Sequence, residues 1–206
     1  MKTGPKTGDA RQRILDAANR IMAAGGFSGV GINEVLAAAG VPKGSFYHHF
    51  GSKDAFGAAL IEGYFDRSLA ELDLILRSED LSTGQRLMNY WKHWSATQMG
   101  PNLHEKCLAV KLGAEVSDVS ETMRLALSKG TEKIIERIAA AILRGTSDGS
   151  IAAAGEPKMI ARTLYQMWLG ASVMAKITRS HIPFQDAAVA SNHLLNPKSR
   201  DDATPL

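Results

Sequence analysis

Apolar residues recur every three or four positions along most of the 206-residue chain. In 9–24, for example, Ile14, Ala18 and Ile21 fall on one face of a helix. Gly25-Gly26 follows, and glycine readily adopts the left-handed conformation that ends many helices. Sustained alternation of polar and apolar residues, which is typical of a half-buried strand, is absent from the sequence. The pattern therefore predicts an all-α protein.

The same periodicity predicts the other helices, and glycine, proline and polar clusters separate them. Further helices are expected at 32–39, 53–77, 83–99, 103–116, 119–144, 156–180 and 184–195. One more short helix is expected to start near Pro42. The breaks are expected at Pro101, Asp118, the RGTSDGS segment, the GEP segment and Pro183. The polar residues 196–206 are expected to form a disordered tail.

Composition narrows the class of protein. With 45% hydrophobic and 22% charged residues, the chain is typical of a globular protein. No apolar run approaches the roughly 18 residues of a membrane span, and the first ten residues lack the apolar segment of a signal peptide. A single cysteine excludes an internal disulfide. We therefore expect a cytoplasmic protein with no membrane partner.

The net charge of +3 is confined to the first quarter of the chain. Residues 1–55 contain seven Lys or Arg against four Asp or Glu, whereas 56–206 contain seventeen of each sign. A basic end on a neutral body predicts an anionic partner for that end, although chance clustering of three charges is the alternative.

A tight turn between two short helices is predicted within the basic end. Gly40 allows a sharp chain reversal, and Pro42 suits the first turn of the following helix. Two short helices joined in this way form a helix-turn-helix. On the second helix, the predicted buried face consists of Phe46, His49 and Phe50, which lie three or four residues apart.

The opposite side of this second helix carries polar groups that suit DNA. Lys43 stands in the first turn, where a recognition helix meets base edges, and Gly44 lets the backbone approach a phosphate. Lys53 opens the next helix behind Ser52, a candidate N-cap, and free N–H groups at that terminus attract phosphate. We therefore predict binding to double-stranded DNA; a merely solvated polar face is the alternative.

The stretch GFSGVGINEVLAAAGVPKGSFYHHFGSKDAF resembles the DNA-binding domain of the TetR (tetracycline-repressor) family. The resemblance covers roughly 9–57 and implies a homodimeric repressor on a palindromic operator. It also implies a three-helix DNA-binding domain at 1–55 and a larger helical domain at 56–195 for effector sensing and dimerisation. The implied DNA-contacting residues are Ser28, Asn33, Lys43, Gly44, Ser45, Tyr47, His48 and Lys53. Gly31 departs from the pattern, because many relatives have a phosphate-contacting Ser or Thr there.

The larger domain is expected to contain a site for a small-molecule effector. Helices 83–99 and 156–180 carry aromatic and methionine stripes, which more often form core than pocket. The candidate pocket residues are Trp91, Trp94, Tyr165, Trp168, Leu169 and Ser172.

Cys107 and Lys176 are the candidate effector-sensing residues. Cys107 lies near a predicted helix start, beside Lys106 and one turn before Lys111, a setting that favours the thiolate and its reactivity. The alternative is a small buried hydrophobic residue, which most free cysteines are. Lys176 either extends its ammonium to solvent or is held inside, where it could stabilise an anion or a thiolate.

The segments KCLAVKLGAEVSDVSETMRLALSKG and LYQMWLGASVMAKITRS resemble TetR-type repressors that respond to electrophiles and oxidants. The resemblance implies that Cys107 is the sensing residue and Lys176 its partner. Because no second cysteine is present, the modification cannot be an internal disulfide. Three products stay open: an adduct, a sulfenic acid or a Cys–Lys linkage. Acrylate-responsive repressors share much of the pattern, so a reversibly bound unsaturated acid, with a structural Cys107, is the alternative.

Two other classes of protein compete with a ligand-responsive repressor. An enzyme is disfavoured because the sequence contains no HExxH spacing, no GxSxG elbow and no Gly-rich phosphate loop. Cys107 and a distant histidine could mimic a catalytic pair, but this is weak support for an enzyme. We expect no catalytic residues, no metal and no cofactor. A purely architectural DNA-binding protein would not need the large, aromatic C-terminal domain.

Overall fold

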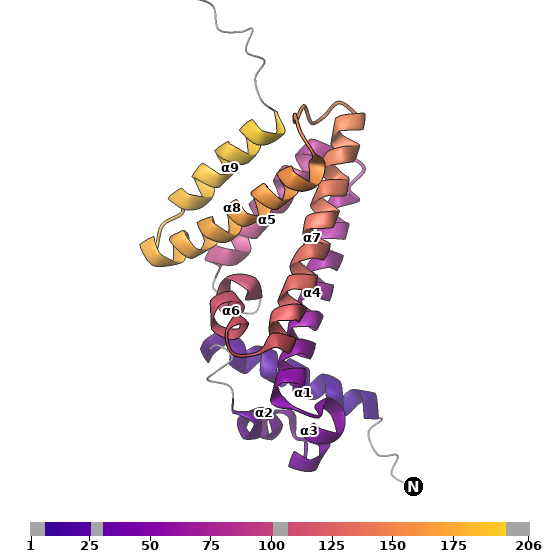
Figure 1. Ribbon diagram of the computed structural model, residues 1–206, viewed down its shortest axis with the longest axis vertical. Helices are drawn as coiled ribbons and strands as arrows, with labels where there is room; N and C mark the ends of the chain where they lie inside the picture. The colour runs from indigo at the N-terminus through magenta and orange to yellow at the C-terminus, as the bar shows by residue number, and fades with distance from the viewer. Residues whose placement is uncertain (1–6, 26–30, 101–106, 197–206) are drawn as a thin grey trace, which may run out of the picture. The chain divides into compact units, whose positions relative to one another are not determined.

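The computed structural model describes residues 7–25, 31–100 and 107–196, and its regular structure is α-helical throughout (Figure 1). The helices are α1 (Thr7–Gly25), α2 (Ile32–Ala39), α3 (Lys43–Phe50), α4 (Lys53–Leu76), α5 (Thr83–Met99), α6 (Leu108–Ser117), α7 (Glu121–Ser147), α8 (Pro157–Thr178) and α9 (Ile182–Leu195). The all-α prediction is confirmed. Within the described ranges, none of the helices is both long and apolar enough to cross a membrane.

The turn between α2 and α3 forms as the sequence predicts. Gly40 ends α2 in the left-handed conformation, with φ 62° and ψ 40°, where a side chain would add strain. The N–H of Val41 then donates to the carbonyl of Leu36 at 3.0 Å. Pro42, with φ −61° and ψ 147°, is the N-cap of α3. The chain therefore reverses between the two helices, as a helix-turn-helix requires.

Two helix termini differ from the sequence predictions because glycine and proline are accommodated inside helices. Gly145 stays helical, since its missing side chain leaves room for Ile151, whose N–H donates to the Gly145 carbonyl at 2.9 Å. The break predicted at Arg144 is therefore about one turn too early. Pro183 lies in the first turn of α9, where its missing N–H costs nothing, so the break predicted there is also wrong.

The start of α6 also differs from the prediction. The expected helix 103–116 begins at Leu108, and Cys107 is its N-cap, with φ −59° and ψ 119°. Residues 103–106 lie outside the described residues. Cys107 therefore precedes the helix instead of lying within it.

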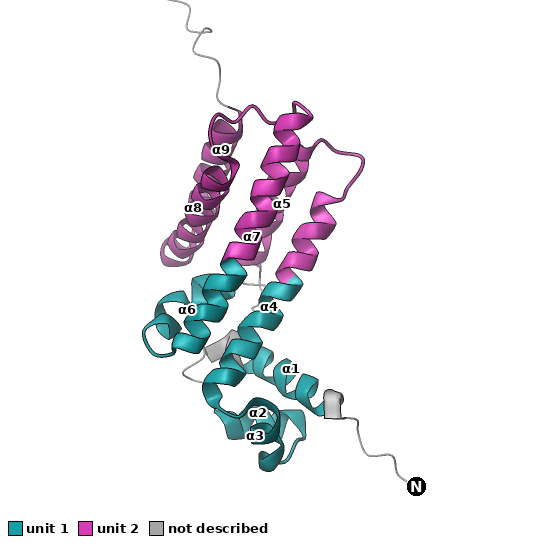
Figure 2. Cartoon of the chain, turned by 45° about the vertical axis from the view of Figure 1, so that its right-hand side comes forward, with its two compact units in different colours: residues 1–67, 101–131 teal, residues 68–100, 132–206 magenta. Residues whose placement is uncertain are grey.

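The chain folds into two compact units, and each is made from two separate stretches (Figure 2). The first unit, 1–67 with 101–131, contains α1, α2, α3 and α6 with the beginnings of α4 and α7. The second unit, 68–100 with 132–206, contains α5, α8 and α9 with the remainder of α4 and α7. The linear domain limits expected from the sequence stay predictions.

Aromatic rings form much of the core around α3. Phe46 is completely buried, and its ring centroid lies 5.3 Å from that of Phe50 and 5.1 Å from that of Phe56 at the start of α4. Phe50 is 8% exposed and His49 is half-buried. The predicted buried face of the second helix is thus confirmed for its two phenylalanines, and these rings fix how α3 presents its other side.

Candidate DNA interface and effector region

The solvent-facing side of α3 carries the residues that the sequence assigns to DNA contact. Lys43, Gly44, Tyr47 and His48 are exposed, and Ser45 is half-buried. Tyr47 is 53% exposed although its ring contacts buried Phe46 edge-on, at a centroid distance of 5.3 Å. A helix that is anchored on one side by aromatic rings and polar on the other can enter a major groove.

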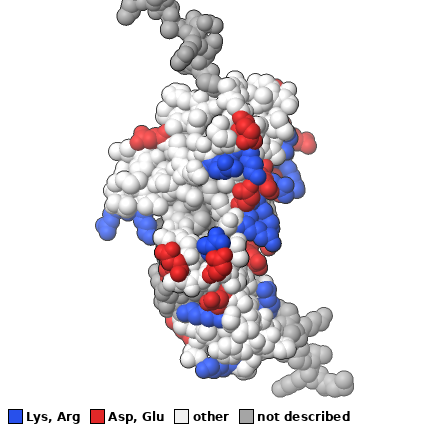
Figure 3. Space-filling view, in the orientation of Figure 1, with Lys and Arg blue, Asp and Glu red and all other residues white. Residues whose placement is uncertain are grey.

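The N-terminus of α4 provides a second group of candidate contacts in the same unit. Ser52 is its N-cap, as predicted, because the Ser52 hydroxyl oxygen accepts the Ala55 N–H at 3.0 Å. Lys53 is exposed beside it. In Figure 3, Lys or Arg side chains also lie at the lower edge of the described residues, where Figure 1 places α2 and α3. Backbone N–H groups and cations together suit a DNA phosphate.

The N-terminus of α2 lacks a capping side chain. Gly31 occupies the N-cap with φ −77° and ψ 123°, which any residue can adopt. A Cβ there would make only an ordinary contact with Glu34, at 3.8 Å, so neither sterics nor backbone conformation demands glycine. Asn33 is exposed on α2, and Ser28 lies outside the described residues. The inference that Gly31 lacks the phosphate contact made by Ser or Thr in many relatives stays a prediction.

Cys107 is buried at the N-terminus of α6, with 2% of its surface exposed. Burial raises the pKa of its thiol from the ordinary value of 9.0. Hydrogen bonds from the Tyr64 side chain and from the N–H groups of Val110 and Ala109 lower the pKa by less. Burial therefore opposes the thiolate that the sequence predicts, because loss of water outweighs the hydrogen bonds at the helix terminus, and the sensing role of Cys107 stays a prediction. Lys106 lies outside the described residues.

Lys176 and Cys107 belong to different compact units. Cys107 lies in the first unit with Tyr64, whereas Lys176 lies in the last turn of α8, in the second unit. The Lys176 side chain is exposed in this chain. Its role as a sensing partner therefore stays a prediction.

Three of the six candidate pocket residues, Trp94, Tyr165 and Ser172, belong to the packing between α5 and α8. Trp94 Nε1 donates to the hydroxyl of Ser172 at 2.9 Å, and that hydroxyl donates to the Trp168 carbonyl at 2.7 Å. Tyr165 is 1% exposed, with its ring edge-on to Trp94 at a centroid distance of 5.8 Å, and Leu169 is half-buried. A buried tryptophan with a satisfied N–H stabilises this packing, as a core residue does.

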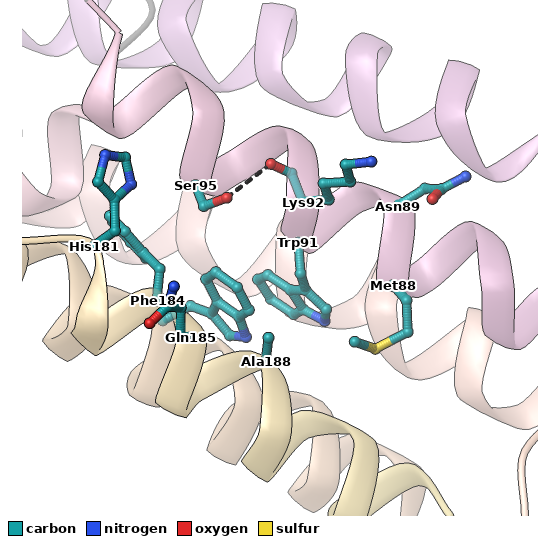
Figure 4. A pocket seen from close by; sticks show the side chains of 10 residues that line it. Met88, Asn89, Trp91, Lys92, Ser95, His181, Phe184, Gln185 and Ala188 are labelled. Atoms are coloured by element: carbon teal, nitrogen blue, oxygen red, sulfur yellow. Dashed lines mark hydrogen bonds between the residues drawn. The ribbon is translucent and has the colours of Figure 1, made fainter.

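A cavity of about 490 Å³ lies between α5 and α9 in the second unit (Figure 4). Trp91 and Trp168 are the two candidate pocket residues that line it. The lining residues that sequence reasoning missed are Met88, Asn89, Lys92, Ser95, His181, Phe184, Gln185 and Ala188. The helical spacing of Met88, Lys92 and Ser95 could have indicated one wall. The other wall depends on the packing of α9 against α5, which no local pattern reveals.

Two family models match the chain. One is described as "Bacterial regulatory proteins, tetR family" and matches 14–60, which contains α2 and α3. The other is described as "Tetracyclin repressor-like, C-terminal domain" and matches 83–191. All the candidate DNA-binding residues thus fall in the first match, and all the cavity residues fall in the second.

Curated relatives and solved structures resemble the chain over most of its length. The HTH-type transcriptional repressor NemR of Escherichia coli is 37% identical over 87% of this chain and 90% of its own length. The transcriptional regulator AcuR of Cereibacter sphaeroides is 31% identical, over 84% of this chain and 79% of its own. The crystal structure of reduced E. coli NemR has a TM-score of 0.83, covering 91% of this chain and 98% of that one.

Proposed function

The chain belongs to the tetR family of bacterial regulatory proteins, and from this premise we propose that it is a repressor released from its operator by chemical modification of Cys107. It is a DNA-binding transcriptional regulator and not an enzyme. Because its partner is chromosomal DNA, it acts in the cytoplasm. The operator is an inverted repeat, since a two-fold dimer presents two copies of α3.

Dimerisation through α8 and α9 is supported by apolar side chains exposed on both helices. Val173, Met174 and Ile177 on α8 are 41%, 47% and 69% exposed, and Val189 on α9 is 58% exposed. The three α8 residues share one helix face, so a second copy could cover them together. Ile177→Glu should therefore yield a monomer in sedimentation experiments and weaken operator binding. An Ile177→Glu variant that stays dimeric would move the interface elsewhere.

The observation that carries the sensing proposal is the contact between Cys107 and Tyr64. Cys107 precedes α6, Tyr64 lies on α4, and Lys53 begins the same α4 at the candidate DNA interface. Because Cys107 is almost fully buried, any group added to its sulfur needs space that the packed unit does not provide. Modification would displace α6 or α4 within the compact unit that also contains α3. That displacement changes how the recognition helix meets DNA.

Two reactions of the thiol fit this proposal. With an α,β-unsaturated carbonyl compound, the sulfur bonds to the β-carbon and the thiol proton is transferred to the α-carbon. With a peroxide, the sulfur gains one oxygen as the O–O bond breaks and water leaves, which gives a sulfenic acid. Lys176 is the proposed partner that makes the thiol more responsive.

Binding to DNA from upstream of the protein's own gene tests the proposal. The parent protein, Cys107→Ser and Lys176→Ala are each titrated with N-ethylmaleimide and with hydrogen peroxide while operator binding is followed. The parent should dissociate, Cys107→Ser should stay bound, and Lys176→Ala should respond more slowly. If Cys107→Ser is released at the parent's dose, the thiol mechanism is wrong. Release by acrylate from both proteins would then establish a reversibly bound unsaturated acid as the effector.

A further inference from the structure

The basic end contains arginines to which neither the sequence nor the site described above assigns a role. Besides Lys43 and Lys53, the described part of residues 1–55 contains three Lys or Arg side chains, all on α1: Arg11, Arg13 and Arg20. Arg11 and Arg20 are exposed. They lie about two and a half turns apart and therefore point to opposite sides of α1.

The Arg11 side chain contacts the recognition helix. Its guanidinium lies over the ring of Phe50, the last residue of α3, with Cζ 5.3 Å from the ring centroid. The face of an aromatic ring is negative and attracts a cation in this position. Phe46 and Phe56 pack against the same ring at centroid distances of 5.3 and 5.0 Å, so the ring is held in place. Figures 1 and 2 both show α1 beside α3 within the first unit.

This stack lies at the end of α3 that adjoins the candidate phosphate site. Ser52 and Lys53 follow Phe50 directly in the chain, and Phe50 packs edge-on against Phe56 in the first turn of α4. In a helix-turn-helix, the N-terminal residues of the recognition helix contact base edges, while surrounding cations and N–H groups contact the DNA backbone. Arg11 is therefore placed for a phosphate and not for a base.

The stacked guanidinium keeps the groups that a phosphate needs. A ring covers one face of the guanidinium, whereas its five N–H donors lie in its plane and stay available. Two of them can donate side by side to two phosphate oxygens, which a lysine cannot do. None of the ion pairs between described residues involves Arg11. Because the ring already restricts the side chain, less conformational freedom is lost on binding.

We propose that Arg11 binds a backbone phosphate of the operator and that its stack on Phe50 holds it in position for this contact. The contact adds a cation from α1 to the candidate contacts of α3 and α4. It rests on the DNA binding of the family and requires no reaction at Cys107. Because a phosphate carries no sequence information, the contact strengthens binding to operator and unrelated DNA alike.

Arg11→Gln tests the phosphate contact in the full-length protein. Fluorescence anisotropy follows binding to DNA from upstream of the gene, and to an unrelated duplex of the same length, at several salt concentrations. For each chain bound, the slope of log affinity against log salt concentration should fall by about one, and the affinity by roughly fivefold at about 0.15 M salt. Arg11→Lys keeps the charge and should retain the parent's slope.

Arg20→Gln is the matched control, because it removes an exposed arginine from the opposite side of the same helix. It should retain the parent's slope and affinity. A parental slope in Arg11→Gln, or an equal loss of slope in Arg20→Gln, would overturn the proposal. Failure of the parent itself to bind either duplex would instead overturn the repressor function on which the proposal rests.

A merely structural contact between Arg11 and Phe50 predicts a different result. Arg11→Gln would then have a lower melting temperature by circular dichroism and an unchanged salt slope, and this outcome would overturn the phosphate contact. Phe50→Leu keeps an apolar side chain but removes the ring, so Arg11→Gln should weaken operator binding less in this background than in the parent. Equal losses in both backgrounds would show that the ring does not position Arg11. Because Arg11 is exposed, Arg11→Gln decides the phosphate contact even if Phe50→Leu fails to fold.

Discussion

Gly130 of α7 lies directly against the ring of Phe65 of α4, within the first unit. A Cβ at position 130 would overlap three carbon atoms of that ring. Phe65 is 3% exposed, so its ring has little space into which it could move. The close packing of these two helices therefore depends on the absence of a side chain at Gly130.

Gly130→Ala should destabilise the protein. Alanine is favoured over glycine inside a helix by about 1 kcal/mol, but overpacking a filled core costs about 1–3 kcal/mol. The overlap with Phe65 should prevail and lower the urea midpoint of unfolding. Gly113→Ala in α6 is the control, because no atom lies within 4 Å of its Cβ position, and it should stabilise by up to about 1 kcal/mol. Equal stabilisation by both substitutions would contradict the close approach.

Local sequence signals were sufficient for most helices and failed where tertiary packing decides. Gly40 and Pro42 locate the turn between α2 and α3, since one adopts positive φ and the other is an extended N-cap. Gly145 carries the same helix-ending signal, yet it is helical because Ile151 fills the space beside it. No local pattern distinguishes a glycine that ends a helix from one that allows close packing.

Lys53→Ala should weaken DNA binding by removing one phosphate contact. Each lost contact should lower the slope of log affinity against log salt concentration by about one. The loss should be similar for operator and unrelated DNA, because phosphate contacts carry no sequence information. The measurement is DNA binding by fluorescence anisotropy at several salt concentrations. Lys133→Ala is the control, because it removes an exposed lysine of α7 that belongs to the second unit. A wild-type slope and affinity in Lys53→Ala would remove Lys53 from the interface.

The hydrogen bonds around Asp148 should make stability depend on pH. The Ser150 side chain, then Thr83 and the Ser150 N–H, donate to this carboxylate and lower its pKa from 3.8 to about 2. The Thr83 hydroxyl lies 2.5 Å from Oδ2 and the Ser150 N–H nitrogen 2.8 Å from Oδ1. Since the folded pKa is depressed, the stabilisation is complete above pH 3.8 and is lost as the pH falls through about 2.

Asp148→Ala should therefore have a lower melting temperature than the parent at neutral pH. This difference in melting temperature should disappear on acidification to about pH 2. Thermal unfolding followed by circular dichroism measures both curves. Asp186→Ala, which removes another exposed carboxylate from the same unit, is the control and should show a smaller gap. A gap between parent and Asp148→Ala that is independent of pH would mean that the carboxylate charge contributes nothing.

The candidate site was less predictable than the fold because burial and long-range partners determine its chemistry. The chain position of Cys107 suggests a helix N-terminus, but only the folded unit reveals that its side chain is 2% exposed and hydrogen-bonded to the side chain of Tyr64. Ser172 lies on the same stripe as aromatic residues, yet it serves as the acceptor for Trp94, 78 positions away. The sequence identifies these residue types, whereas the fold decides which become ligand contacts and which become core.

Reaction of Cys107 with N-ethylmaleimide should accelerate with pH up to and beyond pH 9. Burial holds the pKa of this thiol above 9.0, so the thiolate is scarce at neutral pH and the rate should rise about tenfold per pH unit. Tyr64→Phe removes a hydrogen bond that lowers the pKa, so it should react more slowly than the parent at every pH below the plateau. Mass spectrometry of the intact protein gives the rates, and circular dichroism verifies the fold at each pH.

Tyr47→Phe, on the exposed side of α3, is the matched control for that experiment and should react at the parent's rate. A rate for the parent that levels off below pH 8 would show that the thiolate is already formed there, contrary to the effect of burial. Equal rates in Tyr64→Phe and the parent would mean that the tyrosine hydroxyl does not stabilise the thiolate. Slower reaction of Tyr64→Phe alone, with Tyr47→Phe unchanged, would identify Tyr64 as the residue on α4 that positions and tunes the thiol.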